Sequence, residues 1–181
     1  MTRRDALLRL SALFGGTIFG AQRLLAGPAS AVRTGPSVAL IADDLALLNE
    51  VAETILPATP DSPGAKAADV AAFMQEIARD FYDERERALL LAAPARFNEA
   101  SAVKYDGRTF GMLTGDERYQ LLLELDAAIP PPEYYQMVKQ LTLWGYWTSE
   151  IGATQALNHL PVPGMYQGCI PAEPGTKAWA N

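Results

Sequence analysis

The stretch VAAFMQEIARDF, residues 70–81, decides the fold class of this 181-residue chain. Its large apolar side chains recur at intervals of three and four residues, which is the period of an amphipathic α-helix. These side chains are Val70, Phe73, Met74, Ile77 and Phe81. Nowhere does the chain alternate polar and apolar residues for long enough to predict a β-strand. The pattern therefore predicts an all-α protein.

The segments on either side of this helix are also predicted to be helical. Residues 43–56 carry leucines and isoleucine at helical spacing, and Pro57 ends that pattern. Residues 83–100 begin with a charged turn and continue with apolar residues. Because a proline inside a helix costs about 3 kcal/mol, we expect a kink or a restart of the helix at Pro94.

Two more helices are predicted in the second half of the chain. Thr114 with Glu117 three residues later forms a capping box, which predicts a helix start, and Pro130 to Pro132 stop that helix. The next helix is indicated by residues that mark one of its faces. They are Tyr134, Met137, Leu141, Trp144 and Thr148.

We therefore expect a single helical domain of five to six helices over residues 43–159, preceded by a linker at 32–42. Residues 160–181 are too rich in proline and glycine for regular structure, yet they include Met165, Tyr166, Ile170 and Trp179. A disordered tail seldom carries so many large apolar groups. This tail is predicted to be an ordered, irregular strap that lies on the helical body or against another molecule.

Residues 1–31 have the features of a twin-arginine export signal. Arg3 and Arg4 precede a mildly apolar run, and Ala29 and Ala31 form a small-x-small cleavage site. The run is shorter than the ~20 residues that a membrane-spanning helix needs, although a membrane anchor or a frayed helix is the alternative. The twin-arginine translocase carries folded proteins, so the signal predicts a periplasmic protein, and a partner subunit is the first thing to suspect.

The charge of the chain excludes one class of partner. Four of the 15 basic residues and one of the 21 acidic residues lie in the signal, so residues 32–181 carry a net charge near −9. Nucleic-acid binding requires clustered Lys and Arg. We therefore expect no nucleic-acid partner.

The chain has one cysteine, Cys169, and one histidine, His159. It contains no CxxCH haem attachment, no HExxH metal site, no GxGxxG nucleotide motif and no GxSxG nucleophile. We therefore expect no cofactor, metal or catalytic residue on this chain. A Cys169–His159 pair remains an alternative, and Cys169 is otherwise a small buried residue or one half of a disulfide to another chain.

Two blocks of sequence resemble a known family. The first runs from Ile55 to Ala65 (ILPATPDSPGA), and the second joins Gly145 to Glu150 (GYWTSE) with a later Pro161 to Tyr166 (PVPGMY) and Cys169. These blocks resemble the small, or third, subunit of gluconate 2-dehydrogenase and of related membrane-bound sugar dehydrogenases. The resemblance covers most of residues 43–181, and the twin-arginine signal agrees with it.

The resemblance implies a non-catalytic subunit of a larger complex. In such complexes a large FAD-containing subunit of the glucose–methanol–choline class oxidises the sugar or polyol. A multihaem cytochrome c subunit passes the electrons to quinone, and the partner subunits associate the complex with the inner membrane. The small subunit binds the flavoprotein and supplies its export signal, since the large subunit typically lacks one.

The resemblance leaves the contact surface open, so we nominate residues that suit a partner interface. They are Trp144, Tyr146, Trp147, Tyr166, Cys169 and Trp179. The three aromatic residues on the last helix cannot all face one side, so one is expected in the core and another exposed. The loop at 57–64 is a stiff connector or, less simply, a binding loop. Two alternatives stay open: a free-standing periplasmic enzyme that uses carboxylates or Cys169 and His159, and a scaffold module with another partner.

Overall fold

The computed structural model describes residues 40–162, 164 and 174–180. The export signal at 1–31, most of the linker, and the candidates Tyr166 and Cys169 therefore lie outside the described residues. No helix in the described ranges is long and apolar enough to cross a membrane.

The described chain is mostly helical, as predicted. Its α-helices are α3 (Ala42–Ile55), α4 (Val70–Asp80), α5 (Glu84–Lys104), α6 (Gly115–Ala127) and α7 (Glu133–Thr148). Short 3₁₀ turns, η1 (Ala65–Ala68) and η2 (Phe110–Met112), connect them, and a π-helical turn, η3 (Gly152–Ala156), follows α7. Two-residue strands, β1 (Asn158–His159) and β2 (Trp179–Ala180), pair in parallel.

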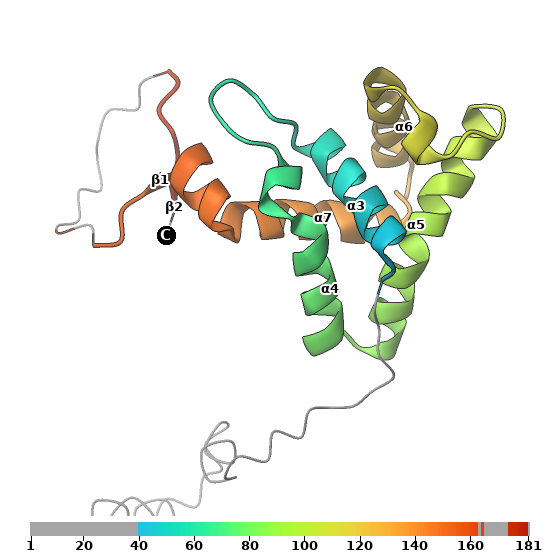
Figure 1. Cartoon of the computed structure of the whole chain (residues 1–181), viewed down its shortest axis with the longest axis horizontal. Helices are drawn as coiled ribbons and strands as arrows, with labels where there is room; N and C mark the ends of the chain where they lie inside the picture. The colour runs from blue at the N-terminus through green and yellow to red at the C-terminus, as the bar shows by residue number, and fades with distance from the viewer. Residues whose placement is uncertain (1–39, 163, 165–173, 181) are drawn as a thin grey trace, which may run out of the picture. The chain divides into compact units, whose positions relative to one another are not determined.

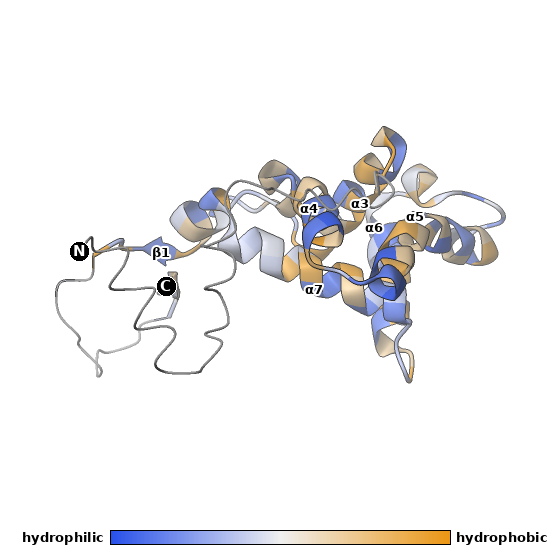
Figure 2. Cartoon of the chain, turned by 90° about the horizontal axis from the view of Figure 1, so that it is seen from below, coloured by the Kyte–Doolittle hydropathy of each residue, from blue (hydrophilic) through white to orange (hydrophobic). Residues whose placement is uncertain are grey.

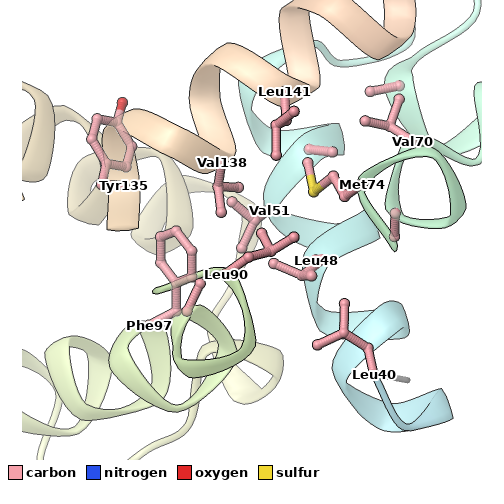
Figure 3. Packing of buried hydrophobic residues seen from close by; sticks show 14 of the residues in the cluster. Leu40, Leu48, Val51, Val70, Met74, Leu90, Phe97, Tyr135, Val138 and Leu141 are labelled. Atoms are coloured by element: carbon pink, nitrogen blue, oxygen red, sulfur yellow. The ribbon is translucent and has the colours of Figure 1, made fainter. Parts of the chain in front are cut away.

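Helix α7 organises the bundle. It contacts each of the other four α-helices as well as η1 and η3, and Figure 1 shows it crossing behind α3 and α4. The core between the helices is apolar, and Figure 3 shows Leu48 and Val51 of α3 facing Val138 and Leu141 of α7. Phe97 of α5 closes the core on a further side.

The buried side of α7 differs from the face that the apolar pattern marked. Leu141 is buried as expected, but Trp144 and Thr148 are exposed. The buried side instead comprises Tyr135, Val138, Leu141, Thr142, Gly145 and Tyr146. The pattern was misleading because it counts large side chains, whereas a small residue packs α7 closely on α4. A Cβ atom on Gly145 would lie 2.6 Å from the ring of Phe73.

Capping boxes start two of the helices. The Thr114 side chain accepts a hydrogen bond from the backbone of Glu117, and the Glu117 carboxylate accepts one in return, which confirms the predicted start of α6. Asp83 and Glu86 form the same arrangement at the start of α5. Each box satisfies backbone N–H groups that would otherwise lack a partner at the helix end.

Helix α5 continues through Pro94 without a restart, so of the two expected outcomes, a kink or a restart, the restart does not occur. Pro94 cannot donate the usual backbone hydrogen bond, which is the reason for expecting a break. Its ring, however, is fully buried, as are Leu90 and Phe97 of the same helix. Burial of apolar surface on this side of the helix offsets the lost hydrogen bond, and periodicity alone cannot register that compensation.

The close contact at Gly145 gives a first prediction. Changing Gly145→Ala places a methyl group 2.6 Å from a carbon of the Phe73 ring, so the ring or the helices must shift. We expect a loss of about 1–3 kcal/mol in the free energy of unfolding. Urea unfolding followed by circular dichroism measures it. Gly115→Ala is the matched control, because nothing lies within 4 Å of a Cβ atom there. Equal stability of the two variants would contradict the close packing.

Candidate functional site

Tyr146 joins the two sequence blocks that carry the family resemblance. Its side chain is buried, with 2% of its surface exposed. The hydroxyl donates a hydrogen bond to the Pro63 carbonyl at 2.5 Å and lies 2.7 Å from the hydroxyl of Ser62. Since its one proton goes to the carbonyl, the phenol oxygen accepts from Ser62. Segments more than 80 residues apart in the chain therefore meet at this side chain.

The loop at 57–64 is also fixed from the α3 side. The Glu53 carboxylate accepts hydrogen bonds from the backbone N–H groups of Ala58, at 3.0 Å, and Lys66, at 2.8 Å. A Cβ atom on Gly64 would lie 2.2 Å from an oxygen of this carboxylate, so only glycine fits there without a shift. Together with the Tyr146 bonds, these contacts support the interpretation of the loop as a stiff connector between α3 and α4.

The two tryptophans of α7, which are close to Tyr146 in sequence, are exposed. Trp144 has 57% and Trp147 has 39% of its surface exposed. Each indole meets the ring of a neighbour edge to face: Trp144 meets Phe73 with centroids 6.0 Å apart, and Trp147 meets Tyr146 at 5.0 Å. The expected division of these aromatic residues into core and surface is thus observed, with Tyr146 in the core.

The C-terminal end of the tail is hydrogen-bonded to Asn158, which follows α7 and η3. The backbone N–H of Asn158 donates to the Ala178 carbonyl at 2.8 Å, and its side-chain amide donates to the Lys177 carbonyl at 3.0 Å. Trp179 lies on β2 and remains exposed. In the described part of the tail, backbone hydrogen bonds to β1 hold the chain, whereas Leu160 and Val162 are exposed. Lys177 also donates to the Gln155 carbonyl of η3. Most of the predicted strap lies outside the described residues, so its packing stays a prediction.

Several charged residues of the described chain form structural ion pairs. Hydrogen bonding from Lys66, with Arg118 nearby, holds the pKa of Glu50 below its usual value, and these contacts link α3, η1 and α6. Hydrogen bonding from Arg108 lowers the pKa of Glu117 to about 2. Every shifted carboxylate pKa in the described residues is lowered. A general acid at neutral pH needs a raised pKa, so none of these four carboxylates has the property of a general acid.

The part of the chain that the structure describes contains no candidate metal centre, and it includes only one member of the Cys169–His159 pair. Among the described residues, no group of three or more His, Cys, Asp or Glu side chains is placed to hold a metal ion. His159 lies on β1 and is exposed. Its proposed partner Cys169 is outside the described residues, so the pair stays an alternative.

Sequence reasoning missed two residues that shape this region. Glu53 binds the connector from α3, and Phe73 of α4 supports Trp144. Phe73 was visible as part of a helical pattern, but that pattern could not say that its ring meets α7. Glu53 had no signal of its own, because an acidic residue near the end of a helix is usually solvated.

The Tyr146 hydroxyl provides the second prediction. Tyr146→Phe keeps the ring but removes its hydrogen bond to the half-buried Pro63 carbonyl, which keeps only the Ser62 hydroxyl, 3.3 Å away, as a donor. We therefore expect a loss of about 0.5–1.5 kcal/mol in the free energy of unfolding. Urea titration of the full chain measures this loss. Tyr119→Phe is the control, because Tyr119 is exposed on α6 and should tolerate the change. If both variants unfold at the same urea concentration, the hydroxyl does not fasten the connector.

Comparison with known proteins identifies the family. The family model of gluconate 2-dehydrogenase subunit 3 matches residues 42–164, which is more than half of the chain. The match spans all five α-helices, the connector at 57–64 and the aromatic end of α7. No curated protein and no solved structure matches the chain. The chain is a member of the gluconate 2-dehydrogenase subunit 3 family, whose name makes it a subunit of a dehydrogenase complex.

Proposed function

We propose that this chain is the non-catalytic small subunit of a periplasmic, flavin-dependent gluconate or sugar dehydrogenase. In this role it binds the flavoprotein subunit and escorts it through twin-arginine export. The family match over residues 42–164 carries the proposal. The paired Arg3 and Arg4 at the start of the same chain support the escort function.

The physical logic of an escort follows from the cofactor. A flavoprotein acquires FAD as it folds, so it must cross the membrane folded if it is loaded in the cytoplasm. A passenger without its own signal then depends on a tightly bound carrier that has one. Under this proposal the FAD and the c-type haem belong to partner subunits, the cytochrome contacts this chain only indirectly, and the complex is held at the inner membrane by those partners.

The escort function predicts the outcome of a change in the signal. Replacing Arg3 and Arg4 by Lys should leave both this subunit and the flavoprotein in the cytoplasm, because the translocase recognises the arginine pair rather than its charge. Dehydrogenase activity and immunoblots of periplasmic and cytoplasmic fractions measure the distribution. Replacing Arg9 and Arg23 by Lys makes the same number of changes within the signal and should leave export intact. Active flavoprotein in the periplasm of the Arg3 and Arg4 variant would refute the escort function.

A non-catalytic role also predicts the properties of the purified chain. It should carry no flavin, haem or stoichiometric metal and should not oxidise sugars with artificial electron acceptors. Visible absorption, metal analysis and a dye-reduction assay test these expectations. A stoichiometric chromophore or turnover that Cys169→Ser or His159→Gln abolishes would favour the free-standing enzyme instead.

A further inference from the structure

The outward side of α7 has a composition unlike the rest of the surface. From residue 136 on, its exposed positions are Gln136, Gln140, Trp144, Trp147 and Thr148, and its half-exposed positions are Met137, Lys139 and Leu143. After Glu133 the only charge on α7 is Lys139, which is paired with Asp126 at 2.5 Å. Figure 2 shows the second half of α7 without the strongly hydrophilic residues that recur along α5. Depletion of charge and enrichment of tryptophan distinguish the centre of a protein interface from ordinary surface.

The two exposed indoles are held in place before any partner binds. Phe73 supports Trp144, and Tyr146 supports Trp147 through edge-to-face contacts. Tyr146 is itself fixed by its hydroxyl bonds to Pro63 and Ser62. Side chains with restricted rotamers lose less conformational entropy on binding, so these two indoles are suited to act as anchors.

Acidic residues lie around this surface. Glu76 is one helical turn from Phe73, Glu150 follows Trp147 by three residues, and Asp61 adjoins Ser62, which binds Tyr146. All three are exposed, and in the part of the chain that the structure describes none of them forms an ion pair. A partner that complements this surface would present an apolar patch with Lys and Arg at its rim.

We propose that this tryptophan face, formed by Gln140, Trp144 and Trp147 with Asp61, Glu76 and Glu150 at its rim, is the docking surface for the flavoprotein subunit. The inference rests on the proposed function and specifies its partner's chemistry: an apolar patch that accepts two indoles, surrounded by basic side chains. The tryptophans supply the affinity, and the acidic rim raises the association rate.

A second exposed pair on α6 serves as a comparison. Tyr119 and Leu123 lie one helical turn apart and have 53% and 43% of their surface exposed, close to the values for Trp144 and Trp147. Their helix, however, also exposes Asp116 and Glu124, and Glu124 pairs with Lys104. Because charge is interspersed on this side of α6, it lacks the composition of an interface centre.

The first experiment compares the two surfaces. The tagged full chain is co-expressed with the FAD-loaded flavoprotein, and the complex is purified through the tag. The FAD-to-subunit ratio and the dissociation constant are then measured. Replacing Trp144 and Trp147 by Ala should weaken the complex by at least about 100-fold. Replacing Tyr119 and Leu123 by Ala should change the affinity by less than about threefold. Circular dichroism and thermal unfolding of each variant establish that both remain folded.

The second experiment tests the acidic rim. Asp61→Asn, Glu76→Gln and Glu150→Gln in one variant should slow association about tenfold at low ionic strength, and the difference should vanish at high salt. A control with the same charge change uses Glu99→Gln in α5, Asp106→Asn in the turn after α5 and Glu124→Gln in α6. Stopped-flow or biosensor association rates distinguish the two variants.

The outcomes separate the inference from the function on which it rests. If the wild-type chain retains no flavoprotein, the proposed function fails. If the wild type binds but the tryptophan variant binds equally well, or the α6 variant loses binding instead, the docking surface is wrong while the function stands. If light scattering shows that the isolated chain is a dimer which the tryptophan variant splits into monomers, the face belongs to a second copy of this chain, and the inference is overturned.

Discussion

The buried hydroxyl of Tyr146 is the interaction on which the arrangement of this subunit depends. Its bond to the Pro63 carbonyl fixes the connector between α3 and α4 to the end of α7. The backbone of the same residue shapes the turn after α7, because its carbonyl accepts from both the N–H and the hydroxyl of Ser149. A Cβ atom on Gly152 would lie 2.0 Å from that carbonyl oxygen, so the turn requires glycine at this position.

Helical periodicity and capping residues predicted much of the fold. The pattern of residues 70–81 and the Thr114 capping box correspond to α4 and α6. The pattern was less informative where the packing depends on small or unusual residues. Pro94 lies inside a helix that continues past it, where burial of its ring offsets the lost hydrogen bond. On α7 the small residue Gly145 lies on the buried side and packs against Phe73, whereas Trp144 and Trp147 are exposed. Both outcomes depend on neighbours that are distant in sequence.

The surface was predictable in residue type but not in geometry. Sequence reasoning selected Trp144, Tyr146 and Trp147 and predicted that at least one is buried and another exposed. It could not predict that Tyr146 is the buried one, because this depends on its bond to Ser62, 84 residues away. The acidic rim could not be recognised in sequence, because Asp61 and Glu76 come from a loop and a helix that only the fold brings near α7. Tyr166 and Cys169 lie outside the described residues, so their place at an interface stays a prediction.

An escort places a specific demand on the surface that holds its passenger. A complex that crosses the membrane as one folded unit must survive the transit, so slow dissociation matters more than fast association. Among related interfaces, affinity differences arise mostly from the dissociation rate, to which rigid, desolvated aromatic anchors contribute strongly. The edge-to-face supports beneath Trp144 and Trp147 supply that rigidity. In the proposed docking surface, the buried Tyr146 therefore acts by positioning the exposed Trp147, as Phe73 does for Trp144.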